Sequence, residues 1–338
     1  MWPLSRDDTP KQFLKLFDYK SLFQLTLDRA LKLVPASRIF ISTSQKYIPQ
    51  VKKESKKISD ENIIGEPMRR DTALAMGLGA LYIQKRDPDA IIVNLASDHL
   101  IKPISIFIKN MLEAARFAFE SDQVVTIGIR PKFPHTGMGH IKFSGNKGLK
   151  FVEKPSLPLA KQYTSSGDYY WNANLYVWKA KVFLDLLKKH SPKTYSMFPK
   201  ILNSMGTDKE REILQLTFQM APVISVDYAV SEKLQKFICL PAGFSWTDVG
   251  DWNEVWKNLP KDSLGNVISG PKGKGKYIGL DSSNNLLFLD KQLIATAGVK
   301  DMLIIDTLES LLICPKNDAQ AVKKIVEILK EQDLTKYL

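Results

Sequence analysis

The sequence predicts an α/β protein whose open sheet is mostly parallel and covered by helices, followed by a small all-β module. Between about residues 20 and 130, apolar runs alternate with helical patterns, a rhythm typical of strands connected by helices. Residues 265–315 instead hold short strands separated by Gly, Asn and Asp turns. An amphipathic pattern over 319–332 predicts a closing helix. We therefore expect two domains, 1–260 and 261–338.

Each element of the first domain has its own signal. Apolar residues at helical spacing predict helices over 22–34, 71–85, 106–121, 181–190 and, more briefly, 225–235. Strands are predicted over 38–43, 90–97, 124–129, 139–144, 149–154 and 169–180. The run at 90–97 is apolar throughout, as expected for a strand buried on both faces of a parallel sheet. The sequence NKG between 139–144 and 149–154 predicts a hairpin.

Composition and charge narrow the class of protein. The 338 residues are 44% hydrophobic and 25% charged, as in an ordinary globular protein. The net charge of +12 comes mainly from scattered lysines, which favours a solvated basic surface over nucleic-acid binding. No apolar run reaches the roughly 18–20 residues that span a bilayer, so no membrane partner is expected. Cys239 and Cys314 have no CxxC or His-rich context, which indicates a cytoplasmic setting without disulfides.

Two aspartates are candidate metal ligands. Asp98 follows the apolar run at 90–97, and open α/β sheets bind ligands at the carboxyl ends of their strands. Asp248 lies in WTDVGDW, a turn that leads into a helix. Carboxylate oxygens suit Mg²⁺, which keeps waters and substrate phosphates in its shell. Each aspartate taken alone also fits a helix cap or a turn, and the sequence does not show whether the two converge.

Two lysines that adjoin prolines are candidates for phosphate contacts. Lys154 lies between Glu153 and Pro155, and the proline is expected to hold Lys154 in an extended conformation. A strand-end lysine of fixed direction suits a phosphate monoester, while Glu153 can accept hydrogen bonds from sugar hydroxyls. Lys11 follows Pro10 and invites the same interpretation. An exposed ion pair at a strand end is the alternative for Glu153 and Lys154.

A glycine and an asparagine are weaker candidates. HTGMGHI at 135–141 contains Gly137, where backbone can approach a ligand closely, although composition alone favours a plain hairpin turn. Asn172 in WNAN can donate to and accept from sugar hydroxyls. The sequence has no GxxxxGK[ST] loop and no GxSxG or Cys/His nucleophile context, so covalent catalysis has no support.

Eight segments of the sequence occur in an order that is characteristic of one enzyme family. They are WPLSR…PKQF at 2–13, EPMRRDTALAM at 66–76, ASDHLI at 96–101, HTGMGHI at 135–141, FVEKP at 151–155, WNANLYVWK at 171–179, SVDYAVSEK at 225–233 and WTDVGDW at 246–252. In this order they resemble the mannose-1-phosphate guanylyltransferases, or GDP-mannose pyrophosphorylases, of the sugar nucleotidyltransferase family. The later segments GNVISG, KDMLIIDT and LLICPKNDAQAVKKIV extend the resemblance over essentially the whole chain.

The resemblance implies a fold and a reaction. The fold is a Rossmann-like nucleotidyltransferase domain with a mixed, mostly parallel sheet, followed by a short left-handed β-helix. The reaction transfers GMP from GTP to mannose 1-phosphate and gives GDP-mannose and pyrophosphate. The sugar-phosphate oxygen attacks the α-phosphorus in line, a step that depends mainly on positioning and charge neutralisation. The product places the chain in GDP-mannose biosynthesis.

The resemblance also implies roles for individual residues, by matching position. Mg²⁺ is held by Asp98 and Asp248. The nucleotide is contacted by Lys11, Glu66, Arg70, Asp71, Thr72 and Asp98. The sugar phosphate is contacted by Gly137, Glu153, Lys154 and Asn172. The implied catalytic set is Lys11, Asp98, Lys154 and Asp248.

The chain departs from the family pattern at four positions and at its start. Asp71, Leu74, His135 and Asn174 stand where Asn, Pro, Glu and Gly are usual. Two other functions therefore stay open: a nucleotidyltransferase for another sugar 1-phosphate, and a non-catalytic or regulatory relative that binds nucleotide sugars.

The family's GGxGTRL loop directly precedes WPLSR, whereas Met1 stands at the position of its last Leu. We expect the chain as written to lack this phosphate loop and to need it for activity. We also expect that the chain can form a homodimer.

Overall fold

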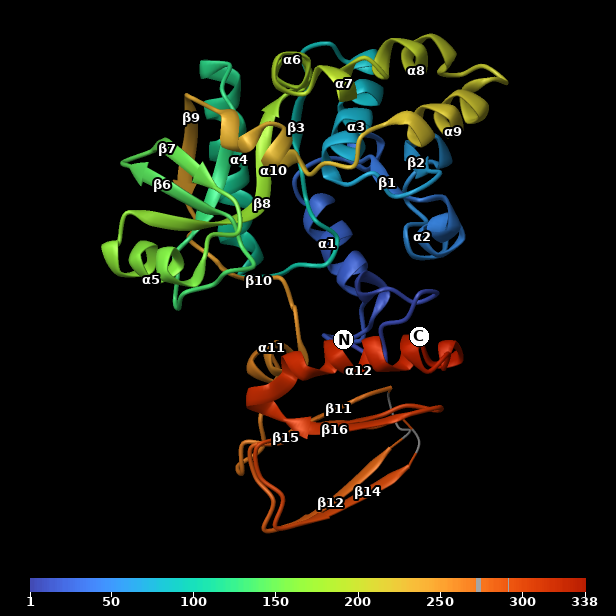
Figure 1. Cartoon of the computed structure of the whole chain (residues 1–338), viewed down its shortest axis with the longest axis vertical. Coiled ribbons are helices and arrows are strands. Elements are labelled where there is room, and N and C mark those ends of the chain that lie inside the picture. The colour runs from blue at the N-terminus through green and yellow to red at the C-terminus, as the bar shows by residue number, and fades with distance from the viewer. Residues whose placement is uncertain (272–274, 291) are drawn as a thin grey trace. The chain divides into compact units, whose positions relative to one another are not determined.

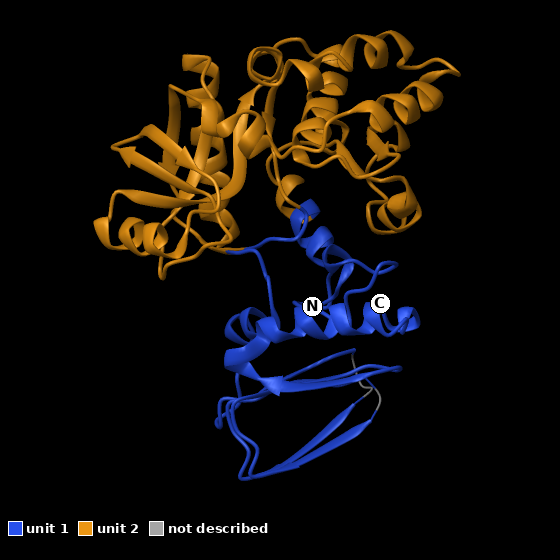
Figure 2. Ribbon diagram, in the orientation of Figure 1, with its two compact units in different colours: residues 1–27, 97–100, 247–338 blue, residues 28–96, 101–246 orange. Residues whose placement is uncertain are grey.

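The computed structural model describes residues 1–271, 275–290 and 292–338, which form two compact units. Unit 1 comprises residues 1–27, 97–100 and 247–338, and unit 2 comprises residues 28–96 and 101–246 (Figure 2). The chain passes from one unit to the other within α1 (Leu22–Ala30), just before Ser97, within β4 (Leu100–Lys102) and within β10 (Ser245–Thr247). The domain boundary predicted between residues 260 and 261 remains a prediction.

A six-stranded sheet forms the centre of unit 2, in the order β3-β8-β5-β9-β7-β6, and β8 also pairs with β6 (Figure 1). Its strands are β3 (Ile91–Val93), β5 (Val125–Ile129), β6 (His140–Ser144), β7 (Lys147–Val152), β8 (Tyr169–Lys179) and β9 (Phe237–Pro241). β6 and β7 form the hairpin that the NKG sequence predicts. The α/β class predicted from the alternating pattern is confirmed.

Strand direction in this sheet differs from the expected parallel majority. β5 and β9 are parallel, whereas β8 is antiparallel to β3, β5 and β6, and β7 is antiparallel to β6 and β9. The reason is that β8 returns from the hairpin and inserts between β3 and β5, two strands of the same direction joined by α4 (Ile104–Ser121). β3 is consequently a half-buried strand at the sheet edge, and the expectation that 90–97 is buried on both faces is wrong.

Side chains of β8 alternate between two cores, because successive residues of a strand point to opposite faces of the sheet. Tyr176 and Trp178 belong to one core, and Leu175 and Val177 belong to the other. The first core also takes side chains from α3 (Thr72–Arg86), α6 (Ala180–His190), α8 (Phe198–Ser204) and α9 (Glu210–Met220). The second core is covered by α4. The predicted helices 106–121 and 181–190 thus lie directly on the sheet, and the predicted helix 71–85 packs against α6 in the first core.

The remaining elements of unit 2 are short. β1 (Ile41–Ser44) and β2 (Ile63–Glu66) form a separate parallel pair. The helices are α2 (Ile48–Glu54), α5 (Leu157–Ser166), α7 (Pro192–Tyr195) and α10 (Val226–Ala229), and the single turns of 3₁₀ helix are η2 (Ala36–Arg38), η3 (Gln45–Tyr47), η4 (Asp60–Asn62) and η5 (Ser231–Lys233). Among the described residues of the whole chain, no helix has the length and apolar character that a bilayer crossing requires.

The C-terminal part of unit 1 is a β-helix. One sheet has the order β11-β13-β15-β16 and the second pairs β12 with β14. The strands are β11 (Val267–Ser269), β12 (Lys276–Leu280), β13 (Leu286–Phe288), β14 (Leu293–Ala297), β15 (Met302–Asp306) and β16 (Leu311–Pro315). All pairs are parallel except β15–β16, so the chain alternates between two parallel sheets as it coils. The predicted β-helix is confirmed, while its left hand remains a prediction.

The N-terminal segment packs on this β-helix and shares its core. Trp2, Leu14 and Phe17 are buried in one cluster with Trp252 and Leu286. The Trp252 indole N–H donates to the carbonyl of Trp2 at 2.9 Å. The helical elements of unit 1 are η1 (Lys11–Phe13), α11 (Trp252–Asn258), η6 (Lys316–Ala321), α12 (Val322–Glu331) and η7 (Thr335–Tyr337). This packing explains why residues 1–27 and 247–338 form one unit although they lie at opposite ends of the chain.

Candidate active site

Three of the predicted site residues meet in unit 1. Lys11 opens η1, whose Phe13 is buried and packs edge-on against Phe23 with ring centroids 5.8 Å apart. The Lys11 ammonium lies 2.7 Å from a carboxylate oxygen of Asp98 and donates to the backbone carbonyl of Asp248 at 2.5 Å. The structure therefore brings Lys11, Asp98 and Asp248 together from three distant parts of the sequence, a convergence that the sequence does not show.

The Asp98 carboxyl is held in its charged form. Burial opposes ionisation, but the Lys11 ammonium, with a further contribution from His99, lowers the pKa of Asp98 below its ordinary value. The Asp98 and Lys11 side chains keep 34% and 22% of their surface exposed, so both can still be reached by a ligand. A charged, partly accessible carboxylate beside an ammonium suits a polyphosphate ligand and its counter-ion.

The backbone next to Asp248 is strained. Val249 is fully buried and has φ 50, although a β-branched residue rarely adopts the left-handed region. Its N–H donates to the hydroxyl oxygen of Thr247 at 3.1 Å, which helps to hold the turn. Strain of this kind costs about 1–3 kcal/mol and persists where the surrounding structure fixes it, often at a functional site. The sequence motif WTDVGDW gave no signal of this strain.

The residues present fit a magnesium ion. A Cβ on Gly250 would lie 3.2 and 3.3 Å from the two carboxylate oxygens of Asp248, so glycine keeps space in front of that carboxylate. Together with the charged Asp98, this gives two carboxylates, and Mg²⁺ in nucleotide enzymes is commonly held by one or two carboxylates plus substrate phosphates. Over residues 1–271, 275–290 and 292–338, no group of three or more His, Cys, Asp and Glu side chains could hold a metal without such help.

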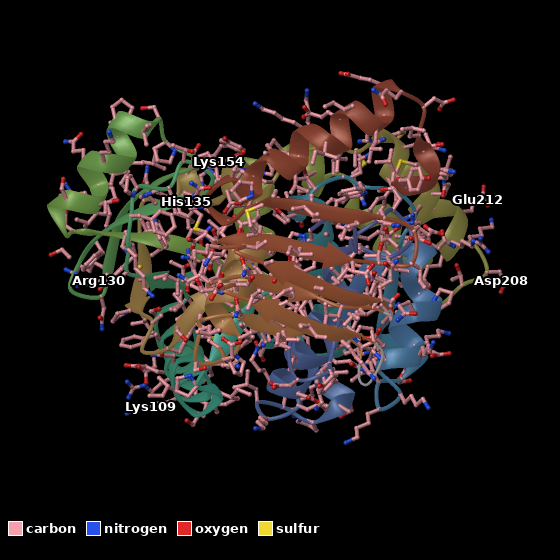
Figure 3. All side chains as sticks on the ribbon, turned by 90° about the horizontal axis from the view of Figure 1, so that it is seen from below. Lys109, Arg130, His135, Lys154, Asp208 and Glu212 are labelled. Atoms are coloured by element: carbon pink, nitrogen blue, oxygen red, sulfur yellow. The ribbon has the colours of Figure 1, made fainter. Side chains whose placement is uncertain are left out.

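A second set of predicted residues lies in unit 2, around the turn that follows β7. Lys154, labelled in Figure 3, is exposed. Its ammonium pairs with the buried carboxylate of Glu153 at 3.2 Å. The hydrogen bond and charge of Glu153 raise the pKa of Lys154, which favours the protonated, positively charged form of Lys154. Lys154 has φ 43, so the expectation of an extended conformation is wrong. The clash with the following proline disfavours the right-handed helical region, and here the tight turn into α5 selects the left-handed region instead.

Asn172 is part of a buried hydrogen-bond network that the sequence did not predict. Its Nδ2 donates to Asp227 Oδ1 at 3.0 Å and to the Tyr176 hydroxyl oxygen at 3.1 Å. The Tyr176 hydroxyl lies 2.9 Å from the same Asp227 oxygen and 2.8 Å from the Ser231 hydroxyl. The Asn172 carbonyl oxygen accepts the N–H of Asn174 at 3.1 Å. The amide of Asn172 is thus fixed at both ends.

Glu153 also has partners that sequence reasoning missed. Its backbone N–H donates to Glu232 Oε1 at 2.8 Å. A Cβ on Gly139 would lie 2.6 Å from Glu153 Oε2, so glycine is required for the carboxylate to lie where it does. Burial, and then the charge of Asp227, raise the pKa of Glu153 above its ordinary value. The sequence signal for these partners is the SVDYAVSEK segment, which contains Asp227 and Glu232. The segment is part of the family resemblance, but the sequence analysis assigns these two residues no role.

Gly137 lies in a turn that His135 holds. The Gly137 N–H donates to Nδ1 of His135 at 2.9 Å. The His135 ring also packs against Phe133 and Trp171, with centroids 5.6 and 5.9 Å away. Trp171 precedes Asn172 on β8, and the Asn172 N–H donates to the carbonyl of Gly139 at 2.8 Å. The structure therefore joins the HTGMGHI turn to the WNAN strand.

The predicted nucleotide-binding residues of unit 2 have local structural partners. Glu66 accepts a hydrogen bond from Ser42 at 2.7 Å, and burial raises the pKa of Glu66. The guanidinium of Arg70 donates to two backbone carbonyls at the end of α9, including that of Gln219 at 2.8 Å. Asp71 caps α3 through the N–H of Thr72 at 2.7 Å and has φ 65. The Thr72 hydroxyl oxygen accepts the N–H of Val226 at 2.8 Å.

Comparison with known proteins gives the same assignment along the whole chain. The nucleotidyl transferase family model matches residues 1–263, and the MannoseP isomerase/GMP-like beta-helix domain matches residues 275–329. Mannose-1-phosphate guanylyltransferase 2 of Escherichia coli O157:H7 is 35% identical over 356 aligned residues, which cover 100% of this chain and 72% of that protein. Mannose-1-phosphate guanylyltransferase of Salmonella montevideo is 36% identical over 98% of this chain and 71% of that protein.

A solved structure has the same fold. The crystal structure of a protein from Thermus thermophilus, titled mannose-1-phosphate geranyltransferase, superposes with a TM-score of 0.88 at 29% identity, over 98% of this chain and 95% of that chain. Fold, site residues and matches together define an enzyme of the nucleotidyltransferase class. Within that class, the chain belongs to the mannose-1-phosphate guanylyltransferase family. The predicted resemblance is confirmed.

Proposed function

We propose that the chain transfers GMP from GTP to mannose 1-phosphate and releases pyrophosphate. The observation that carries the proposal is the convergence on the Lys11 ammonium, which lies 2.7 Å from the Asp98 carboxylate and 2.5 Å from the Asp248 carbonyl. A fixed cation beside the Asp98 carboxylate, with the backbone carbonyl of Asp248 as its second partner, is an arrangement suited to a nucleoside triphosphate. The relatives named mannose-1-phosphate guanylyltransferase support the choice of sugar and nucleotide.

In the proposed reaction, a bond forms between a phosphate oxygen of mannose 1-phosphate and the α-phosphorus of GTP. The bridging bond from the α-phosphorus to the β-phosphate oxygen breaks, and its electron pair leaves with pyrophosphate. Lys11 offsets charge on the triphosphate, and Lys154 orients the sugar phosphate. Glu153 and Asn172 select the sugar hydroxyls, and Gly137 lets backbone approach the sugar. No protein nucleophile is needed, because positioning and charge supply the rate acceleration.

We propose Mg²⁺ as the cofactor, with Asp98 and Asp248 as its ligands. The support is the charged state of Asp98 and the open space that Gly250 leaves at Asp248. When bound, the ion supplies positive charge to the phosphate oxygens.

We further propose that Glu66, Arg70, Asp71 and Thr72 contribute to the guanosine site and that the enzyme is cytoplasmic. The free thiols of Cys239 and Cys314 support this location, and the homodimer remains a prediction.

The assay that tests this function supplies GTP, mannose 1-phosphate and Mg²⁺ and measures pyrophosphate release. It is run on the 338-residue chain and on the chain extended at its N-terminus by the GGxGTRL segment that the family resemblance places before WPLSR. GDP-mannose formation by either form is the expected result. Absence of turnover with every nucleotide triphosphate, in both forms, contradicts the proposal.

A nucleotidyltransferase for another sugar 1-phosphate is the second candidate. It is favoured by His135, which holds the Gly137 turn where the family usually has Glu. A panel of hexose 1-phosphates, each tested with GTP, separates the two functions. A higher kcat/KM for a sugar other than mannose 1-phosphate favours the second.

Lys154→Ala is expected to weaken use of the sugar phosphate more than binding of GTP. Lys154 carries the exposed ammonium of the Glu153–Lys154 pair and is assigned to the phosphate monoester. We expect KM for mannose 1-phosphate to rise about tenfold or more, while the Kd for GTP stays within about twofold. Lys150→Ala, at an exposed position of β7, is the matched control. Equal losses for both substrates would contradict the role given to Lys154.

A further inference from the structure

The segment that contains α10 and η5 supplies two acidic side chains that reach separate parts of the proposed sugar-phosphate site. Asp227 is buried and accepts hydrogen bonds from Asn172 and Tyr176. Glu232 accepts the backbone N–H of Glu153, the residue before the strained Lys154. Ser231 lies between them in sequence, and its hydroxyl contacts that of Tyr176 at 2.8 Å. One short segment thus contacts both the WNAN and the FVEKP motifs.

The electrostatics of this cluster oppose folding rather than favour it. Burial raises the pKa of Asp227, and burial followed by the charge of Asp227 raises the pKa of Glu153, to which Glu232 also contributes. Burial together with nearby carboxylates is a poor means of stabilising a fold, because both disfavour the charged form of Glu153. Such a cluster is more common at a functional site than in an ordinary core.

The hydrogen bonds of Asp227 set the orientation of the Asn172 amide. With Nδ2 bound to Asp227 and Oδ1 bound to the N–H of Asn174, the amide cannot flip without losing both partners. Tyr176 alone can accept one hydrogen bond from Asn172, at 3.1 Å, but a hydroxyl that rotates does not distinguish donor from acceptor. The carboxylate accepts only, and it therefore fixes which end of the amide points into the protein.

Glu232 acts on the other motif through the backbone. Its contact with the Glu153 N–H is 2.8 Å long and charge-assisted, which makes it stronger than a neutral hydrogen bond. The next residue, Lys154, has φ 43, and a residue in this region reverts to an extended conformation unless neighbouring contacts hold it. Glu232 is the acidic side chain that fixes the entry to this turn.

We propose that Asp227 and Glu232 are positioning residues of the sugar-phosphate site, Asp227 through the Asn172 amide and Glu232 through the Glu153–Lys154 turn. The proposal rests on the proposed function, because it assigns Asn172, Glu153 and Lys154 to mannose 1-phosphate. Neither residue is placed in contact with substrate. Their removal is expected to change sugar-phosphate recognition while GTP recognition is kept.

The experiment compares four variants with the wild type: Asp227→Ala, Asp227→Asn, Glu232→Ala and Glu232→Gln. All are made in whichever of the two forms above, the 338-residue chain or the extended chain, shows turnover as wild type. The alanine variants are expected to raise KM for mannose 1-phosphate about ten- to one-hundredfold and to leave KM for GTP within about twofold. Glu232→Gln keeps an acceptor oxygen for the Glu153 N–H and should recover most of the wild-type KM. Asp227→Asn keeps one acceptor oxygen but adds a donor, so it should recover the wild-type KM only in part. Asn172→Ala combined with Asp227→Ala should be no worse than Asn172→Ala alone, since Asp227 acts through Asn172.

Ser225→Ala is the control for a merely loosened α10. The Ser225 hydroxyl oxygen caps α10 by accepting the N–H of Tyr228 at 3.4 Å. Ser225 is not part of the hydrogen-bond network of Asp227 and Glu232 described above. This variant should lower Tm with wild-type KM values. A Ser225→Ala variant with the same rise in KM for sugar phosphate, or alanine variants that affect both substrates equally, would overturn the proposal.

Direct binding separates this proposal from the proposed function. Calorimetric titration of mannose 1-phosphate into each protein measures the sugar-phosphate site without turnover. If the wild-type chain binds mannose 1-phosphate but makes no GDP-mannose, the proposed reaction fails and the positioning roles are judged from the Kd values of the variants. If the wild-type chain does not bind mannose 1-phosphate, both proposals are wrong.

Discussion

At the scale of single residues, the site depends on side chains and backbone angles that are individually unfavourable. Val249 and Lys154 have φ 50 and 43, and Glu153 and Asp227 are buried carboxyls with raised pKa values. Each of these features lowers stability, and each adjoins a residue assigned to substrate or metal. Such a pattern is expected where function, rather than folding, has fixed the residue.

Lys11→Met tests the cation of unit 1. The substitution removes the ammonium that pairs with Asp98 and binds the Asp248 carbonyl, and keeps a side chain of similar length. We expect kcat/KM for GTP to fall about 10²- to 10³-fold, because charge on the triphosphate is no longer offset. Steady-state pyrophosphate release measures the effect. Lys15→Met, an exposed lysine of the same segment, is the control, and an equal loss there would contradict a specific role for Lys11.

Glu153→Gln tests the pH dependence of stability. An unfolded glutamate has a pKa of about 4.3, and in the folded chain burial, followed by Asp227, raises it. The folded state therefore binds more protons in the interval between the two values, and the free energy of unfolding falls as pH rises through that interval. Glutamine carries no charge and avoids this loss. We expect the Tm advantage of the variant to be larger at about pH 8 than at about pH 4.

Thermal unfolding monitored by circular dichroism at both pH values measures the difference. Glu120→Gln, at an exposed position of α4, is the control for loss of a charge. A Tm difference that does not depend on pH would show that Glu153 is not the group responsible.

At the scale of elements, glycine marks where helices pack closely. In α3, a Cβ on Gly77 would lie 2.3 Å from Phe198 and 2.9 Å from Leu187, whereas a Cβ on Gly79 has no neighbour within 4 Å. The two glycines lie in the same helix, two positions apart in sequence, and only the first faces α6 and α8. The Ala/Leu-rich pattern of the segment predicts the helix but does not distinguish the two glycines.

Gly77→Ala and Gly79→Ala are therefore expected to have opposite effects. The first overpacks the core and should lower the free energy of unfolding by about 1–3 kcal/mol. The second should raise it by about 0.5–1 kcal/mol, because alanine loses less backbone freedom than glycine on helix formation. Urea unfolding of both variants measures the pair. Destabilisation by both substitutions would show that α3 is packed on both sides.

At the scale of the whole molecule, the excess of positive charge should assist substrate encounter. The chain has 48 Lys and Arg residues against 36 Asp and Glu, and both proposed substrates are anions. We expect kcat/KM for GTP to fall about threefold or more between about 50 mM and about 500 mM NaCl, as salt screens the attraction. kcat at saturating substrate should change less. A kcat/KM that does not depend on salt would show that the lysines affect solubility rather than encounter.

Much of the fold could be predicted because its signals are local. Apolar periodicity predicts α3, α4 and α6, alternation and turn residues predict the β6–β7 hairpin, and regular short strands predict the β-helix. The antiparallel insertion of β8 could not be predicted, because an aromatic-rich run does not reveal which neighbours it pairs with. The local conformation of Lys154 was missed for a related reason, since its φ depends on contacts outside the FVEKP motif.

The sequence by itself determined the family, the fold class and the identity of the candidate site residues, because these follow from residue types in a fixed order. Only the tertiary structure decided which of them meet. It joined Lys11 to Asp98 and Asp248, and it gave Asn172 its buried partner Asp227 and Glu153 its partner Glu232. The physical reason is that hydrogen bonds and ion pairs act over a few ångströms, and only folding brings residues so far apart in the chain within that distance.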